Sequence, residues 1–508
     1  MCTLTRFIAF IFFITPLSLH AQIRLPSIIS DNMILQQHSR VALWGWAEPG
    51  ENITISPGWS SKPVEVKTGS DGKWMTKLST PGHGGPYTIR FKGTNVIEVK
   101  NVLLGEVWLA SGQSNMEFFI GKMPNPSYNG VINHDEVMAD ANHSDIRTID
   151  VPNKVSDEPL NDFAAVWKLC TPATVDTFSA VAYFFARAIN KATGYPVGII
   201  NATWGGTPAE SWTKKDVLQN DSDLQVILTR YQKQVEEFPA ANEKYRAALD
   251  KWRSDSSKTK GSAPAVPMGP ANNKSPYKLY NGMIRPIEPY TIRGVIWYQG
   301  ESNADRAWQY RKLFPAMINN WRKDWSNPTL PFYFVQISPH RSQNPEIRDA
   351  QFYVYKTVPN TGMAVTTDNG DSLNIHPRNK QLVGERLSLW ALRNEYGKKD
   401  LVVSGPLYRS MNIEGDRIRL HFDFDKGLKA KEGELTEFTI AGDDGNFVPA
   451  HAIIDGHTIL VWSETVPHPK NVRFAWRNIP RPNFYNAAGL PASPFRTDQY
   501  KLTTQGIN

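Results

Sequence analysis

Cysteine is nearly absent from the sequence. Of the 508 residues, only Cys2 and Cys170 are cysteines. Cys2 lies in an N-terminal stretch that we expect to be removed, so Cys170 has no partner for an intrachain disulfide in the mature chain. Cys170 follows Trp167 and Leu169, and this apolar setting predicts a buried, unreactive thiol rather than a catalytic nucleophile.

Long apolar runs are also scarce. One run extends from Phe7 to Leu19 near the N-terminus, with Arg6 before it and Ala21 after it. It is too short to span a bilayer, and its charged start and small final residue are typical of a signal peptide. The sequence therefore predicts a signal peptide at 1–21. It also predicts a mature chain that is exported, periplasmic or extracellular, without a membrane span.

Blocks of one charge and metal-binding motifs are missing too. The net charge is +7, but the basic residues are dispersed, which argues against a nucleic-acid partner; a mildly basic surface favours an anionic sugar. The cluster His134, Asp135, Glu136 and His143 lacks the helical spacing of a zinc hydrolase motif. We expect no metal and no cofactor, and keep a metal hydrolase only as a third alternative.

Two kinds of pattern divide the chain. The two end regions contain short alternating apolar segments separated by turn residues, which predicts β-sandwich-like regions. The middle alternates strands with helices, which predicts an α/β domain with a mostly parallel sheet covered on both faces. The expected limits are 22–100 for the first region, 101–400 for the α/β domain and 401–508 for the last, with a helical insertion at about 215–275 that serves as a lid or packing arm.

Ser114 lies where such a sheet binds its ligands. It follows a predicted strand at 107–110, and ligands of open α/β sheets bind at the carboxyl ends of the strands. Backbone N–H groups on this turn can stabilise an oxyanion. A serine at this place is often only a helix cap, so a nucleophilic Ser114 requires a nearby base.

Three other loops follow predicted strands and reach the same edge. The loop after 363–366 carries His376, which is either the required base or a histidine held by loop hydrogen bonds. Gly205 and Gly206 follow the strand at 197–201, and paired glycines let backbone N–H groups approach a substrate oxygen. The loop after 295–298 carries amide side chains that can donate to an oxyanion; they belong to Gln299 and Asn303.

Several motifs resemble those of the sialate O-acetylesterase family, which belongs to the SGNH hydrolases. They are GQSNM at 112–116, WGGT at 204–207, WYQGESN at 297–303 and IHPRNK at 375–380. The likeness continues in DNMILQ at 31–36, YNGMI at 280–284 and GLPASPFRTD at 489–498. The resemblance implies an SGNH-type three-layer α/β/α domain with a parallel sheet, flanked by N- and C-terminal β-sandwich-like regions.

The resemblance also implies a function and a site. The expected enzyme is a serine esterase that removes O-acetyl groups from sialic acid or a related sugar, without a cofactor. Ser114 is implied as the nucleophile and His376 as the base. The implied oxyanion hole combines the Ser114 backbone, a glycine of the pair Gly205 and Gly206, and an amide of Gln299 or Asn303.

The sequence departs from the usual SGNH pattern at the acidic residue. That residue normally stands three positions before the histidine, where this chain has Leu373. Asp371 stands five positions before His376. Either Asp371 orients His376 from a different angle, or the enzyme works as a Ser–His dyad held by a backbone carbonyl.

Substrate identity leaves alternatives open. Arg348 and Arg378 are candidates to pair with the carboxylate of sialic acid, or they form structural ion pairs, and Glu301 is a further candidate substrate-binding residue. An acetylated xylan or another plant polysaccharide is the alternative substrate. A non-catalytic carbohydrate-binding protein is the alternative of another class, because the 16 tryptophans and the β regions suit sugar stacking.

Overall fold

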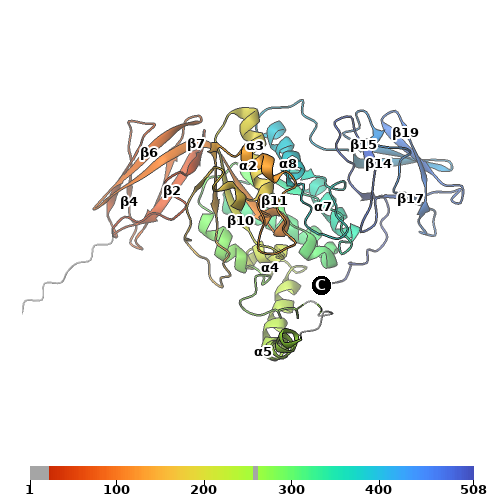
Figure 1. The fold of residues 1–508 in the computed structure, drawn as a ribbon, viewed down its shortest axis with the longest axis horizontal. Coiled ribbons are helices and arrows are strands. Elements are labelled where there is room, and N and C mark those ends of the chain that lie inside the picture. The colour runs from red at the N-terminus through yellow and green to blue at the C-terminus, as the bar shows by residue number, and fades with distance from the viewer. Residues whose placement is uncertain (1–21, 256–260, 262, 508) are drawn as a thin grey trace, which may run out of the picture.

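The computed structural model describes residues 22–255, 261 and 263–507. The stretch predicted to be a signal peptide lies outside these residues. A central body of helices and strands carries a β region on each of two opposite sides (Figure 1). Within the described residues, no helix combines the length and the apolar character that crossing a membrane requires.

The N-terminal region consists of two β layers. Strands β2 (Arg40–Trp46) and β5 (Lys73–Ser79) pair antiparallel in one layer. The other layer contains β3 (Asn52–Pro57), β4 (Val64–Lys67), β6 (Gly84–Lys92) and the start of β7 (Val96–Gly112). Trp74 of β5 contacts Phe91 of β6, with ring centroids 5.9 Å apart. The layers thus share an apolar interior, as the alternating pattern predicts.

Strand β7 belongs to two parts of the molecule. Its first half pairs with β6 and with β1 (Ile34–Gln36). Its second half pairs in parallel with β10 (Val197–Thr203) and β11 (Gly294–Tyr298). The expected boundary at residues 100 and 101 falls inside this continuous strand. No linker therefore separates the N-terminal region from the central body at that point.

The central sheet is largely parallel and covered on both faces. Its order is β13-β12-β11-β7-β10-β8-β9, and every residue of β10 and β11 is buried, as a sheet covered on both faces requires. The further strands are β8 (His143–Asp150), β9 (Lys168–Cys170), β12 (Phe332–Val335) and β13 (Thr361–Ala364). Of these, β9 runs antiparallel to β8.

Two tryptophans show which helices cover which face. Trp108 of β7 contacts Phe185 of α3 (Ala180–Thr193), with ring centroids 5.0 Å apart. The register pairs Trp108 with Gly294, so Trp297, three positions further along β11, points to the other face. There Trp297 contacts Phe314 of α6 (Ala307–Asp324) at 6.1 Å. This arrangement confirms the predicted three-layer α/β/α domain.

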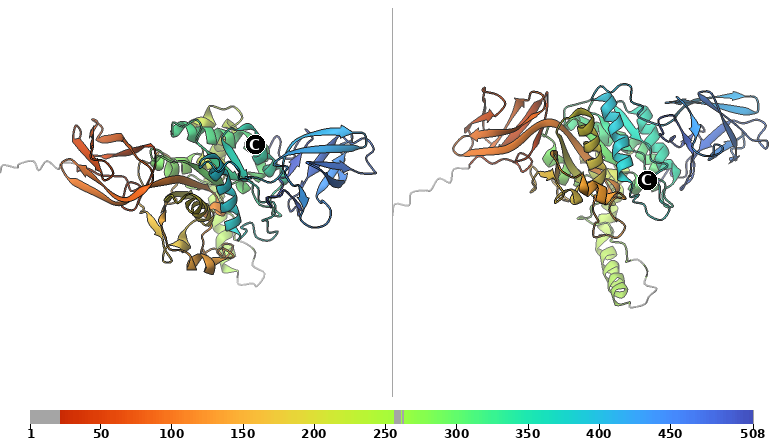
Figure 2. Two further views of the ribbon diagram at one scale, coloured as in Figure 1. Left: turned by 90° about the horizontal axis from the view of Figure 1, so that it is seen from above. Right: turned by 45° about the horizontal axis from the view of Figure 1, so that its top comes forward.

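Two further helices complete the layers. Helix α8 (Lys380–Asn394) packs against α3, and α7 (Pro345–Thr357) packs against α6. The helical excursion consists of α4 (Lys215–Gln219) and the long α5 (Gln225–Ser254), of which only Ile227 and Tyr231 are buried. Helix α5 projects away from the central body (Figure 2, right).

The C-terminal region again has two β layers. One contains β14 (Leu407–Glu414), β15 (Arg417–Asp423), β20 (Thr458–Trp462) and β19 (His451–Asp455); the other contains β18 (Val448–Pro449), β17 (Phe438–Ala441), β21 (Asn471–Phe474) and β23 (Phe495–Arg496). Phe422 of β15 contacts Phe495 of β23 across the layers at 5.8 Å. Between them, β16 (Lys429–Ala430) pairs with β22 (Phe484–Tyr485).

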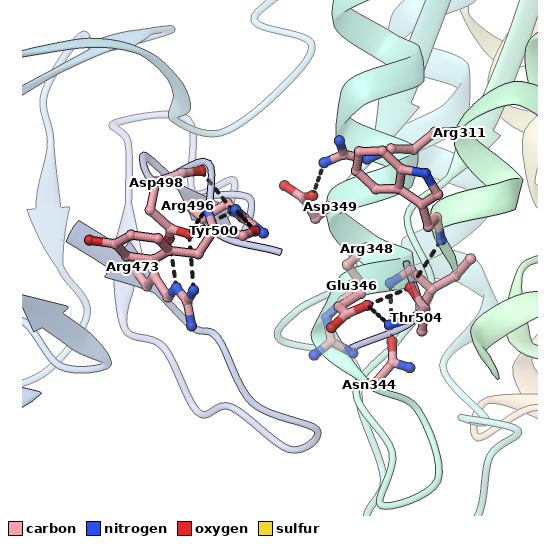
Figure 3. A network of polar contacts seen from close by, with 12 residues as sticks. Arg311, Asn344, Glu346, Arg348, Asp349, Arg473, Arg496, Asp498, Tyr500 and Thr504 are labelled. Carbon is pink, nitrogen blue, oxygen red and sulfur yellow. Dashed lines mark hydrogen bonds and ion pairs between the residues drawn. The ribbon is translucent and has the colours of Figure 1, made fainter. Parts of the chain in front are cut away.

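The chain beyond the last strand fastens this region to the central body. Asp498 lies between Arg473 and Arg496 (Figure 3), and each arginine approaches it to 2.7 Å. The backbone N–H groups of Thr503 and Thr504 donate to Glu346 of α7 at 2.7 and 3.0 Å. The C-terminal tail therefore connects the last β region to α7.

A buried carboxylate joins the N-terminal region to the central sheet. Glu106 of β7 is 1% exposed and accepts hydrogen bonds from Gln37 Nε2 at 2.7 Å, Arg293 Nε at 2.8 Å and the Tyr396 hydroxyl at 3.0 Å. Gln36 Nε2 also donates to it at 3.1 Å. These donors come from three separate segments, so Glu106 holds β1, the start of β11 and the end of α8 together.

We expect Glu106→Ala to lower the free energy of unfolding by about 3 kcal/mol, because removing one partner of a buried ion pair leaves the other charge unsatisfied. Urea unfolding followed by tryptophan fluorescence measures the change. Glu98→Ala is the matched control: Glu98 lies on the same strand, is exposed, and is 3.9 Å from Lys100. It should change the free energy by no more than about 0.5 kcal/mol. Equal effects of the two changes would contradict this role of Glu106.

Candidate active site

Three strands end side by side at one edge of the sheet. Gly112, the last residue of β7, pairs with Thr203 of β10 and with Tyr298 of β11. A Cβ atom at Gly112 would lie 2.2 Å from the Tyr298 carbonyl oxygen, and Gly112 has a φ of +137°. Only glycine fits this close approach. The three loops that follow these strands therefore leave from the same place.

Ser114 and His376 meet at this edge although 262 positions separate them in the sequence. Ser114 begins the short helix α1 (Ser114–Glu117), and its Oγ lies 2.9 Å from His376 Nε2. The imidazole ring stacks on Tyr128, with centroids 4.3 Å apart and planes 25° apart. Both side chains are buried, so the pair has the spacing of a nucleophile and its base before any ligand binds.

Asn115 connects the serine loop to the histidine loop. Its Nδ2 donates to the carbonyl of Ile375 at 3.1 Å and to Glu301 Oε1 at 2.6 Å. Its Oδ1 accepts a hydrogen bond from the buried Lys380 ammonium. Burial lowers the pKa of Lys380 to about 7 and raises the pKa of Glu301. The amide therefore links the Lys380 ammonium to the Glu301 carboxylate beside Ser114 and the histidine loop.

Glu301, the predicted substrate-binding carboxylate, is bonded inside the protein, and its role toward a substrate stays a prediction. Its Oε1 is bonded to Asn115, and its Oε2 is shielded from solvent and without a hydrogen-bond partner. The carboxylate faces the interior because Asn115 and Lys380 lie there.

His376 is a neutral base at physiological pH. Burial lowers its pKa to about 4, and the positive charges of Lys380 and His340 act in the same direction. Its Nδ1 is buried and has no hydrogen-bond partner within the described chain. The backbone carbonyl of Ser127 is the neighbouring group that acts to raise the pKa.

Asp371 does not orient His376. Its Oδ1 accepts hydrogen bonds from the backbone N–H groups of Leu373 at 2.8 Å and Asn374 at 3.1 Å, and these bonds lower its pKa. The carboxylate is thus used in a local turn and is exposed to solvent. Of the two alternatives left by the sequence, the geometry is that of a Ser–His dyad.

The glycine pair lies directly beside the serine. A Cβ atom at Gly205 would lie 3.5 Å from Ser114 Cβ. The N–H of Gly205 donates to Glu117 Oε2 at 2.8 Å, whereas the N–H groups of Ser114 and Gly206 have no acceptor among the described residues. Of the predicted backbone donors, these two remain available to an oxyanion.

Gln299 and Asn303 are bonded inside the protein. Gln299 Nε2 donates to Asn303 Oδ1 at 2.7 Å and to the Thr207 carbonyl at 3.3 Å. Asn303 Nδ2 donates to Glu210 Oε2 at 2.8 Å. Both side chains are fully or almost fully buried. Each amide therefore holds neighbouring loops, and a place for either in the oxyanion hole stays a prediction.

The sequence reasoning missed two residues of the site. Glu117 holds the Gly205 N–H, and burial raises its pKa. Burial and the nearby Glu117 raise the pKa of Tyr128 to about 12, and the contact of its hydroxyl with Ser114 opposes this. Glu117 stands three positions after Ser114, a helical spacing that places both on one face. No sequence pattern pointed to Tyr128, because it lies in an irregular loop.

The two predicted substrate arginines have structural partners. Arg378 donates to the backbone carbonyls of Gly130 at 2.8 Å and Val131 at 3.1 Å, which fastens their loop to the histidine loop. Arg348 is fully buried on α7 and donates to the carbonyl of Arg477 in the C-terminal region (Figure 3). Arg348 is therefore used at the contact between two regions, where its side chain is closed off from solvent.

Metal ligands and a reactive thiol are not part of this arrangement. Among the residues that the structure describes, no group of three or more His, Cys, Asp or Glu side chains is placed to hold a metal ion. His134 instead approaches Asp176 and Asp135. Cys170 is buried, and burial raises its pKa to about 11, which confirms the prediction of an unreactive thiol.

A parallel sheet with helices on both faces and a serine–histidine pair at its carboxyl edge define an SGNH-type hydrolase. Comparison with known sequences gives the family. The family described as "Carbohydrate esterase, sialic acid-specific acetylesterase" matches residues 104–260 and 268–392. The chain belongs to this family, and it is a carboxylic ester hydrolase.

Individual relatives match along nearly their whole length. The sialate O-acetylesterase of Mus musculus is 30% identical, over 93% of this chain and 94% of that protein. The sialate O-acetylesterase of Rattus norvegicus is 29% identical, over 95% of each. A carbohydrate acetylesterase from Xanthomonas citri has a similar structure, with a TM-score of 0.79 and 34% identity over 94% of this chain and 100% of that one.

The low pKa of His376 predicts the acidic limb of the pH profile. Only the neutral imidazole accepts the serine proton, and a folded-state pKa of about 4 keeps it neutral well below the ordinary value of 6.5. We therefore expect kcat/KM for 4-nitrophenyl acetate to stay level from pH 7 to pH 5 and to halve near pH 4. Circular dichroism at each pH verifies that the protein stays folded. An acidic limb centred near pH 6.5 would contradict the effect of burial on an imidazole that has no carboxylate bonded to its Nδ1.

The bonding of Asp371 predicts a mild effect of its removal. Losing the acid of a true triad costs about 10⁴-fold in kcat. For Asp371→Ala we expect kcat/KM to fall by less than about tenfold, because only a turn is loosened, and the acidic limb should stay where it is in the unaltered enzyme. A pH–rate series on both proteins measures this. A loss near 10⁴-fold would show that Asp371 acts on His376 after all.

Proposed function

We propose that the chain hydrolyses O-acetyl esters of sugars, with Ser114 as nucleophile and an O-acetylated sialic acid as substrate. The observation that carries the proposal is the 2.9 Å contact between Ser114 Oγ and His376 Nε2 at the carboxyl edge of the sheet. The family supports the ester chemistry.

The proposed reaction has two steps. His376 Nε2 takes the proton of Ser114 Oγ while this oxygen attacks the acetyl carbonyl carbon. The N–H groups of Ser114 and Gly206 stabilise the resulting oxyanion. His376 then gives the proton to the leaving sugar oxygen, and an acetyl-serine forms. A water molecule, deprotonated by His376, attacks the acetyl-serine, and acetate and free Ser114 result.

Two lines of support concern the sugar. The mammalian relatives are named sialate O-acetylesterases, and the net charge of +7 favours an anionic substrate. The second candidate is an acetylated neutral polysaccharide such as xylan. It is supported by the Xanthomonas citri protein, which is named only as a carbohydrate acetylesterase and matches at 34% identity.

We also propose that the enzyme is exported. The charged Arg6, the apolar run from Phe7 to Leu19 and the small Ala21 support a signal peptide. The mature enzyme would then meet its substrate in the periplasm or outside the cell.

The function is tested by acetate release. We expect the purified enzyme to release acetate from 9-O-acetylated sialic acid faster than from acetylated xylan. Ser114→Ala should lower kcat by at least about 10⁴-fold, because no other group supplies the nucleophile. Faster release from xylan would select the polysaccharide alternative.

The same variant separates catalysis from binding alone. Ser114→Ala should show an unchanged thermal unfolding midpoint, since it removes one hydroxyl group from an otherwise intact loop. Sugar binding by the unaltered protein without any acetate release would favour the non-catalytic carbohydrate-binding alternative.

A further inference from the structure

The return of the helical excursion ends on the glycine turn beside the nucleophile. Asn273 Nδ2 donates to the carbonyl of Gly205 at 3.3 Å. The preceding Asn272 accepts the backbone N–H of Lys274 on its Oδ1 at 2.9 Å, and the following Ser275 is buried. Residues 272–275 are thus fixed against the loop that follows β10, although α5 itself projects away from the body.

This attachment places Lys274 next to the catalytic serine. The Lys274 Cε atom lies 4.0 Å from the position that a Cβ atom of Gly206 would occupy. Gly206 is adjacent to Gly205, whose own Cβ position would be 3.5 Å from Ser114 Cβ. Lys274 is exposed. Its side chain therefore lies over the glycine turn, on the solvent side.

The Lys274 ammonium has no partner in the described part of the chain, since no hydrogen bond or ion pair involves its Nζ. Two other cations near the serine are already engaged. Lys380 is buried and donates to Asn115, and Arg378 donates to two backbone carbonyls. Lys274 is thus an exposed cation beside the glycine turn, and its charge is free to attract a ligand.

We infer that Lys274 is a specificity residue, which pairs with the carboxylate of an acidic sugar while Ser114 attacks its acetyl group. The inference rests on the proposed function and adds the group that recognises the acid. An exposed ammonium and a carboxylate attract each other with a modest, salt-dependent energy. Lys274 therefore affects which acetylated sugar is preferred and leaves the chemistry at the acetyl carbon to Ser114 and His376.

The test compares two substrates that differ at C1, where one has a charged carboxylate and the other a neutral methyl ester. They are 9-O-acetyl-N-acetylneuraminic acid and its C1 methyl ester, with acetate release measured for each. We expect the unaltered enzyme to prefer the acid by about fivefold in kcat/KM, which corresponds to an exposed pair of about 1 kcal/mol.

Lys274→Gln should remove this preference and leave the rate of acetate release from the methyl ester unchanged. Lys274→Arg should retain it, and added salt should weaken it wherever a cation stands at position 274, in the unaltered enzyme and in Lys274→Arg.

Lys244→Gln is the matched control, because Lys244 is an exposed lysine of the same excursion on the projecting helix α5. It should keep the preference for the acid. An unchanged preference in Lys274→Gln would overturn the role of Lys274 and leave the proposed function intact. Hydrolysis of 4-nitrophenyl acetate without hydrolysis of either sialate would overturn the sialate assignment and, with it, the role of Lys274.

Discussion

Strand β7 ends at Gly112 with Thr203 of β10 on one side and Tyr298 of β11 on the other. The approach of Gly112 to Tyr298 is so close that no side chain fits between them. This register brings the loops of Ser114, Gly205 and Gln299 to one edge. Because β7 also pairs with the N-terminal layer, a single strand supports both that region and the serine. The position of the nucleophile therefore depends on strand pairing more than on any contact within its own loop.

The histidine is held in place by its surroundings and not by an acid. Tyr128 stacks on its ring, and Asn115 binds the carbonyl of the preceding residue. Without a carboxylate partner, burial and the nearby Lys380 lower its pKa to about 4. Such an imidazole is neutral over a wide pH range, but it is a weaker proton acceptor than one paired with an acid. The oxyanion donors must then supply more of the stabilisation of the transition state.

The regions around the central body contribute to the site in different ways. The C-terminal region is tied to α7 through Glu346 and Arg348, away from the nucleophile. Helix α5 of the excursion projects from the body (Figure 2), but the segment that returns from it is bonded to the glycine turn through Asn273. The excursion therefore contacts the turn beside the serine through residues 272–275.

Much of the fold could be predicted from the order of apolar patterns along the sequence. Alternating strands and helices gave the α/β body, and Ser114, Gly205 and His376 were identified because each follows a strand of a parallel sheet. Local reasoning failed for residues whose type fits two roles. Arg348, Arg378, Gln299, Asn303 and Glu301 all have polar groups suited to a ligand, yet in the structure each binds another part of the protein. A sequence does not show which partner a polar group will find.

The sequence by itself identified Ser114 and His376 as candidates for the chemistry, because strand-exit position and residue type are both local properties of the chain. Only the tertiary structure decided how they act. Asp371 bonds within its own loop, so among the described residues no acid is bonded to His376. Lys274 lies over Gly206, from a distant part of the chain. The first outcome depends on the conformation of one loop, and the second on packing between segments far apart in sequence. In both, burial and hydrogen-bond satisfaction select one partner among many, and residue type alone does not say which.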